Sequence, residues 1–134
     1  MAGEPIPITE LISGTASEHV CTLVPVASPQ TTAGELRESM AGVHFESATH
    51  VGVCDQGKLV GVLRVEELFG ALSDAKVRDI MDADPPAVAP GVDQEKAAWK
   101  ALQHGESALA IIDNGGRLIG FIPPDRLLAV LLHE

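Results

Sequence analysis

The side chains in this chain that could do chemistry are mostly carboxylates. Its 134 residues include 19 Asp and Glu against 9 Lys and Arg, which gives a net charge of −10. A surface of this sign can attract divalent cations and repels phosphate backbones, so we do not expect nucleic-acid binding. A net charge of this size is explained as readily by solubility, so it does not by itself indicate a metal site.

The residue types that are typical of catalysis lack the spacing that catalysis needs. The five histidines are scattered without an HExxH pattern, and the sequence has neither a GxGxxG fingerprint nor a GxxxxGK[ST] loop. Cys21 and Cys54 lie in apolar runs and form no CxxC pair. We therefore expect no enzymatic activity, and we expect buried free thiols, as in a reducing compartment.

The strongest pattern in the chain is an internal repeat. Residues 53–68 read VCDQGKLVGVLRVEEL, and residues 111–127 read IIDNGGRLIGFIPPDRL. Each copy has an apolar run, an Asp, a Gly-containing turn, a basic residue and an apolar stretch around a central glycine, Gly61 or Gly120. The repeat indicates two copies of one small unit that pack together, which is more typical of a binding module than of a catalyst.

Each copy is predicted to be an α+β unit with the order strand, helix, strand, strand, helix (β-α-β-β-α). In the first copy the expected elements are 23–27, 31–42, 49–54, 58–63 and 65–72, followed by a helical stretch at 77–81. In the second they are 87–90, 93–104, 107–112, 117–122 and a last helix opened by Pro123 and Pro124. Asp93 is the expected N-cap of the helix 93–104. The inward face of that helix is expected to hold Ala97, Ala98, Ala101 and Leu102.

The repeat divides the chain into a flexible lead-in at 1–18, a first repeat at 19–75 and a second repeat at 76–134. No run reaches the roughly 18 apolar residues that span a bilayer, and the N-terminus lacks the features of a secretory signal. The sequence stops at Glu134 in an apolar helix without a helix-stop signal. We therefore expect a fragment of a longer parent protein.

The tandem order, with the pattern D-x-G-x-L-h-G-h (h, apolar) in the hairpins, resembles the cystathionine-β-synthase (CBS) domain pair, or Bateman module. The resemblance covers about residues 20–134, and V-R-D-I-M-D at 77–82 is typical of the entry to the second domain of such a pair. It implies a flat homodimer that forms through the CBS helices and senses a ligand.

The second repeat carries a narrower resemblance, to the cytosolic CBS pair of MgtE-type magnesium transporters. The segment IMDADPPAVAPGVDQEKAAWKAL, and within it the tripeptide Asp93-Gln94-Glu95, is the most telling match. The resemblance implies a regulatory module on the cytoplasmic face of a membrane, in which Mg²⁺ at acidic interfaces favours the closed state of an attached transporter domain. That membrane domain would follow Glu134 in the parent chain.

This resemblance, together with the charge, makes four carboxylates candidate Mg²⁺ ligands. They are Asp93, Glu95, Asp125 and Glu134, with Asp82 and Asp84 as weaker candidates. Mg²⁺ keeps several waters and takes one or two carboxylates from any one surface, so a site can form where acidic faces meet. Helix capping and the helix dipole explain Asp93 and Glu95 equally well. Where the family's last helix has further acidic residues, this chain has Ala129 and Leu132.

The alternative function is that of a CBS sensor in a different parent protein, which binds an adenine nucleotide such as AMP or ATP. Many CBS pairs bind one beside a Ser or Thr and an Asp that follow the hairpin glycine. The matching positions here are Arg64 and Glu67 in the first repeat, and Pro123 and Arg126 in the second. Glu67 could hold a ribose and Arg64 a phosphate, although both also suit an exposed helix start. A third possibility is a dimerising scaffold that has lost its ligand.

Overall fold

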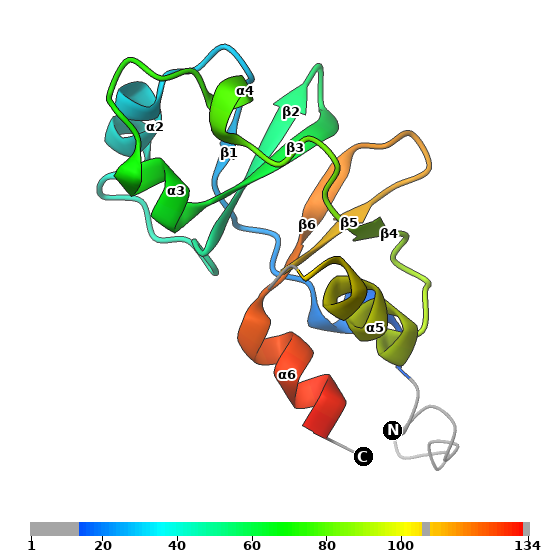
Figure 1. Ribbon diagram of the computed structural model, residues 1–134. Coiled ribbons are helices and arrows are strands. Elements are labelled where there is room, and N and C mark those ends of the chain that lie inside the picture. Colours follow the sequence, from blue (N-terminus) through cyan, green and yellow to red (C-terminus); the bar gives the residue numbers. More distant parts are fainter. Residues whose placement is uncertain (1–13, 106–107, 133–134) are drawn as a thin grey trace.

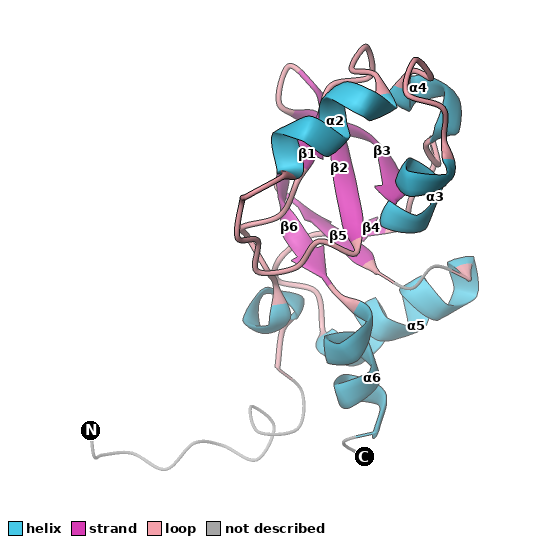
Figure 2. Cartoon of the chain, turned by 90° about the vertical axis from the view of Figure 1, so that its left-hand side faces the viewer, coloured by secondary structure: helices cyan, strands magenta, loops and turns pink. Residues whose placement is uncertain are grey.

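The computed structural model describes residues 14–105 and 108–132, and it contains two three-stranded sheets. The strands lie in the middle of the molecule (Figure 1). The helices of the first repeat lie at one end, and those of the second repeat lie at the other. The view in Figure 2 shows the same arrangement from the side.

The first repeat contains β1 (Val26–Ala27), α2 (Ala33–Met40), β2 (His50–Asp55), β3 (Lys58–Arg64) and α3 (Val65–Gly70). The sheet order is β1-β2-β3, with β1 parallel and β3 antiparallel to β2. Parallel neighbours need a crossover connection, and α2 supplies it. The two antiparallel strands are joined by a tight turn in which Gly57 has a φ of 85°, a value that favours glycine.

The second repeat contains β4 (Ala87–Val88), α5 (Gln94–His104), β5 (Leu109–Ile112), β6 (Leu118–Ile122) and α6 (Pro124–Leu132). Its sheet order is β4-β5-β6, again with one parallel and one antiparallel pairing. The predicted α+β class and the order strand, helix, strand, strand, helix are therefore confirmed in both copies. The edge strands β1 and β4 are shorter than expected.

The first helix of each repeat begins close to its predicted start, and α5 begins directly after its predicted N-cap. Thr32 caps α2 in a capping box, in which its hydroxyl accepts from the backbone N–H of Glu35 and the Glu35 carboxylate accepts from the Thr32 N–H. Asp93 caps α5 by accepting from the backbone N–H groups of Glu95 and Lys96. Gly105, with a left-handed φ of 67°, ends α5.

Each repeat has a core of small and branched aliphatic side chains. One buried cluster joins α2, α3 and the first sheet, and it includes Leu36, Val51, Val53, Leu63 and Leu68. A second joins α5, α6 and the second sheet, and it includes Ala97, Ala98, Ala101, Leu109 and Ile111. The expected inward position of Leu102 is wrong, because this side chain is 54% exposed. The narrow alanine face of α5 already fills the contact with the sheet, which leaves Leu102 outside it.

The segment ahead of each repeat packs on the other repeat. The 3-10 helix η1 (Ala16–His19) precedes the first repeat, and Ala16 is buried in the core of the second. The helix α4 (Val77–Ile80) leads into the second repeat, and Val77 is buried in the core of the first. Part of the expected flexible lead-in, residues 1–13, lies outside the described residues. Residues 14–18 are held in place, because a buried alanine and several backbone hydrogen bonds fix them.

Backbone hydrogen bonds show that the exchange is symmetric. Ala16 N–H donates to the Val92 carbonyl at 2.7 Å, and Val77 N–H donates to the Thr31 carbonyl at 2.8 Å. Further along, Cys21 exchanges two backbone hydrogen bonds with Phe121, and Asp82 exchanges two with Val62. The contact between residues 16 and 92 is equivalent to that between 77 and 31, and the contact between 21 and 121 is equivalent to that between 82 and 62. Each repeat is thus bound by a segment that precedes the other repeat, and we call these two segments straps. Residues 14–21 form the strap of repeat 2, and residues 75–82 form the strap of repeat 1.

No helix in the described ranges 14–105 and 108–132 is long and apolar enough to cross a bilayer.

Candidate ligand-binding cleft

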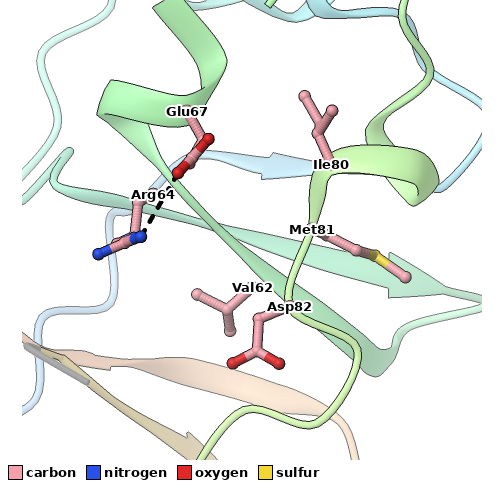
Figure 3. A pocket seen from close by; sticks show the side chains of 6 residues that line it. All are labelled: Val62, Arg64, Glu67, Ile80, Met81 and Asp82. Atoms are coloured by element: carbon pink, nitrogen blue, oxygen red, sulfur yellow. Dashed lines mark hydrogen bonds and ion pairs between the residues drawn. The ribbon is translucent and has the colours of Figure 1, made fainter. Parts of the chain in front are cut away.

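A cleft of about 350 Å³ lies where the first repeat meets its strap. Figure 3 shows its walls, with Arg64 and Glu67 on one side and the strap on the other. We call it the repeat-1 cleft, and it is lined by Val62, Arg64, Glu67, Ile80, Met81 and Asp82.

Two segments of chain position these side chains. Arg64 ends β3 and is the N-cap residue of α3, which places Glu67 in the first turn of that helix. The opposite wall is fixed by backbone hydrogen bonds, from Val62 N–H to the Asp82 carbonyl at 3.0 Å and from Asp82 N–H to the Val62 carbonyl at 2.8 Å. The cleft therefore depends on the strap lying against β3.

The charged side chains in the cleft are paired loosely. Arg64 Nη2 lies 3.4 Å from Glu67 Oε1, and the two side chains are 48% and 55% exposed. An exposed ion pair contributes at most about 1 kcal/mol, so a ligand can separate the two groups at little cost. Both side chains therefore have hydrogen-bonding capacity to offer a molecule in the cleft.

The lining suits a ligand that is part apolar and part charged. Val62, Ile80 and Met81 present apolar surface against which a flat ring can pack. A carboxylate such as Glu67 accepts hydrogen bonds from vicinal hydroxyls, and the Arg64 guanidinium can bind a phosphate in a bidentate manner. The arrangement has the features of a site for a nucleoside phosphate.

Sequence reasoning named Arg64 and Glu67 for this role, and the structure brings them together. It missed Ile80 and Met81, and it treated Asp82 as a weak metal candidate. The segment V-R-D-I-M-D at 77–82 is typical of the entry to a second repeat, which does not indicate a role in the cleft. It lines the cleft because the strap packs against the first repeat.

Arg126, the third residue proposed for nucleotide binding, lies in the corresponding part of the second repeat. Its Nη1 donates to the carbonyl oxygens of His19 at 3.1 Å and Val20 at 3.5 Å. Its Nη2 lies 3.6 Å from the Glu46 carboxylate. Arg126 thus binds the strap of repeat 2 and does not share the cleft of Arg64 and Glu67.

The described candidate metal ligands lie at the starts of two helices and do not form a three-ligand site within one chain. Asp93 is the N-cap of α5, Glu95 is in the first turn of that helix, and Asp125 is exposed at the start of α6. Glu134 lies outside the described residues. In the part of the chain that is described, no three His, Cys, Asp or Glu side chains are grouped closely enough to hold a metal ion.

The two cysteines differ in their surroundings. Cys21 is buried beside Phe121, whereas Cys54 is half-buried at the end of β2 and lines a second, shallow groove of about 540 Å³. Burial raises the pKa of both thiols. For Cys21 the nearby Arg126 guanidinium opposes that rise, and the carboxylates of Glu46 and Asp125 add to it. Both are free thiols, as expected, but only Cys21 is fully buried.

Comparison with known proteins identifies the family. Residues 77–133 match the CBS domain family. Over 90 residues, or 66% of the chain, the sequence is 32% identical to the magnesium transporter MgtE of Thermus thermophilus. The fold is similar to the cytosolic domain of the Mg²⁺ channel MgtE solved in complex with ATP, with a TM-score of 0.79 and 26% identity over 87% of this chain and 48% of that chain. This chain has the fold of a tandem CBS domain pair, and its second repeat matches the CBS domain family.

Other CBS pairs share its architecture at lower identity. The structure of CBSX2 in complex with AMP gives a TM-score of 0.71 at 22% identity, over 89% of this chain and 96% of that chain. At this identity the similarity shows a shared fold only. The present CBS pair spans about a fifth of the length of the curated MgtE relative and about half of the solved MgtE cytosolic domain. CBS domain pairs are regulatory modules rather than catalytic domains.

Proposed function

We propose that this CBS pair is the cytosolic, ligand-sensing module of a magnesium or divalent cation transporter, and that it forms an Mg²⁺-responsive dimer that gates an attached membrane domain. The observation that carries this proposal is the similarity to MgtE in both sequence and fold. The module would lie on the cytoplasmic face of the membrane as part of a longer chain.

The carboxylates on α5 and α6 are chemically suited to bind Mg²⁺ at a meeting of two surfaces. Both backbone hydrogen bonds to Asp93 fall on Oδ2, which leaves Oδ1 for a hydrated cation. Glu95 and the exposed Asp125 carry the same hard oxygen donors, and Glu134 would add another. Since one chain does not group three of the described ligands, a second copy or the membrane domain would complete the site. The ion would then favour the packing in which like charges meet.

Apolar side chains on the helices support dimer formation. Trp99 and Leu102 on α5 are 56% and 54% exposed, and Leu128 and Leu132 on α6 are 55% and 74% exposed. Exposed apolar residues gathered on neighbouring helices are typical of an interaction surface. We expect this surface to be covered in the homodimer.

Thermal unfolding with and without MgCl₂ tests the Mg²⁺ proposal. A ligand that binds only the folded form stabilises it by RT ln(1 + [L]/Kd), about 2.7 kcal/mol at a hundredfold excess. We expect Mg²⁺ to raise the Tm and the dimer fraction of the wild type, but not of the double variant Asp93→Asn, Glu95→Gln. Asn keeps the N-cap, so this variant loses charge without losing the helix start.

A matched control removes two carboxylates elsewhere. Glu66 on α3 and Asp79 on α4 are exposed, and the variant Glu66→Gln, Asp79→Asn makes the same change in net charge. It should keep the Mg²⁺ response of the wild type. An equal loss in both variants, or no response in the wild type, would rule out the proposed site.

The repeat-1 cleft favours a second candidate function, the binding of an adenine nucleotide such as AMP or ATP. Arg64, Glu67 and the apolar wall offer contacts to its phosphate, ribose and base, and the related MgtE cytosolic domain has been solved with ATP. We expect AMP to raise the Tm in the presence of a chelator. Loss of that shift in Glu67→Gln, with the Mg²⁺ response retained, would assign it to the cleft.

A further inference from the structure

The pseudo-symmetry of the two straps defines a second location that corresponds to the repeat-1 cleft. Phe121 pairs with Cys21 as Val62 pairs with Asp82, so Phe121 corresponds to Val62 and Cys21 corresponds to Asp82. The other lining residues are matched by their distance in sequence from these two pairs. We call the matched set the repeat-2 counterpart, and it consists of His19, Val20, Cys21, Phe121, Pro123 and Arg126.

At this location the residue that corresponds to Glu67 has the opposite charge. Arg126 reaches the strap and donates to the carbonyl oxygens of His19 and Val20, which correspond to Ile80 and Met81. A carboxylate cannot donate a hydrogen bond to a carbonyl, so Glu67 cannot make the equivalent contact in the first repeat. The charge reversal therefore accounts for the hydrogen bonds that join α6 to the strap in repeat 2 and have no equivalent from Glu67 in repeat 1.

One further contact adds to these two hydrogen bonds. Arg126 Nη2 lies 3.6 Å from the carboxylate of Glu46, and Glu46 also accepts a hydrogen bond from the Thr22 backbone N–H at 3.0 Å. This ion pair is partly exposed and weak, so the two hydrogen bonds to the strap carbonyls are the main contacts of Arg126. In addition, Phe121 is buried and larger than Val62, and Pro123 has no polar side-chain group to offer a ligand.

We propose that Arg126 is a built-in plug that closes the repeat-2 counterpart, so that the chain takes an adenosine-type ligand at the repeat-1 cleft alone. The expectation that the wild type binds one molecule rests on the proposed nucleotide function of the repeat-1 cleft. The closing of the second location rests only on the contacts of Arg126.

The number of AMP molecules bound per chain tests the plug. Calorimetric titration of the wild type is expected to give one AMP per chain. Arg126→Ala, which removes all three contacts, is expected to bind one more. Arg126→Lys keeps a donor that can reach the strap, and it is expected to behave as the wild type. Arg126→Leu, which has no hydrogen-bond donor, serves as a second opening variant if the alanine variant does not fold.

Photolabelling with 2-azido-AMP locates the bound molecules. In the wild type we expect label on peptides that contain residues 62–82, and in Arg126→Ala additional label on peptides that contain residues 19–21 or 121–126. Two AMP per chain in the wild type, or no additional AMP in both opening variants, would overturn the plug. If the wild type binds none and the opening variants bind one at 19–21 or 121–126, the plug stands and the proposed nucleotide function of the repeat-1 cleft fails.

Discussion

The two repeats have the same topology, yet they treat the same location in opposite ways. In repeat 1, Arg64 and Glu67 form a loose ion pair at the rim of a cleft of about 350 Å³. In repeat 2, Arg126 hydrogen-bonds across to the strap and pairs with Glu46. The difference indicates that the charge of one residue in the first turn of a helix can decide whether that helix is hydrogen-bonded to the strap on the opposite side of the cleft.

The straps also differ in how closely they approach their sheets. A Cβ on Gly120 would collide with the backbone carbonyl of Cys21, which is part of the rigid strap. A Cβ on Gly61 would collide first with the Met81 side chain, which is flexible, and would lie 3.0 Å from the Asp82 carbonyl oxygen. The strap of repeat 2 is therefore the tighter of the two.

The largest effect is expected from alanine at these two glycines. Gly120→Ala should lower the free energy of unfolding by about 1–3 kcal/mol, because the backbone of the strap has to move. Gly61→Ala should stay at the lower end of that range, about 1 kcal/mol, because Met81 can adopt another rotamer. Urea denaturation of both variants measures the difference. An equal or larger cost for Gly61→Ala would show that the straps are equally tight.

The next effect sharpens the comparison by copying repeat 2 into repeat 1. Glu67→Arg places a guanidinium where it can donate to the carbonyls of Ile80 and Met81, as Arg126 does to His19 and Val20. If the proposed AMP site exists, this variant should weaken AMP binding at least about tenfold, or 1.4 kcal/mol, beyond Glu67→Gln. Glu67→Gln is the control, because it removes the charge without adding a group of that length. Calorimetric titration gives both affinities, and equal values would contradict the plug geometry.

A smaller effect concerns the two thiols. Cys54 is half-buried beside an open groove, whereas Cys21 is buried in the strap, where its backbone pairs with Phe121. We expect iodoacetamide to label Cys54 faster than Cys21, because Cys21 reacts only when the strap opens locally. The single variants Cys21→Ser and Cys54→Ser, followed by mass spectrometry, separate the two rates. Faster labelling of Cys21 would mean that the repeat-2 strap is the looser one.

The smallest effect concerns the pH dependence of the capping box at the start of α2 in repeat 1. Hydrogen bonds from the Thr32 backbone N–H and hydroxyl lower the pKa of Glu35 below its ordinary value of 4.5. A lowered folded-state pKa stabilises the protein above that ordinary value, and the contribution is lost as the pH falls through the folded-state pKa. Glu35→Gln should remove this part of the acid-side loss, which thermal unfolding between neutral and acidic pH measures. Unchanged acid sensitivity would contradict the capping box.

Much of the fold could be predicted because the decisive signals are local. The Gly-containing turns that follow Asp55 and Asp113, the apolar runs and the cap at Asp93 each act within a few positions of the chain. These signals located the hairpins and the start of each crossover helix. They also favoured Leu102 as a core residue, which is wrong, since burial on an amphipathic helix depends on how closely the partner sheet approaches.

The candidate site was predictable only in part. Arg64 and Glu67 are neighbours on one helical turn, so their common position follows from their spacing. Their partners Ile80 and Met81 come from a segment that the sequence assigns to the second repeat. No short-range pattern in the sequence indicates that this segment packs against the first sheet.

The sequence by itself determined the repeat, the α+β order of each copy, the acidic surface and the residues that begin the crossover helices. Only the tertiary structure decided that each strap packs on the other repeat, and therefore that Arg126 ties one location across while Glu67 leaves the other unbridged. The physical reason is that a local signal concerns residues within a turn or two. The straps are fixed by backbone hydrogen bonds and buried side chains between residues far apart in the chain, and those contacts exist only after the two halves have packed.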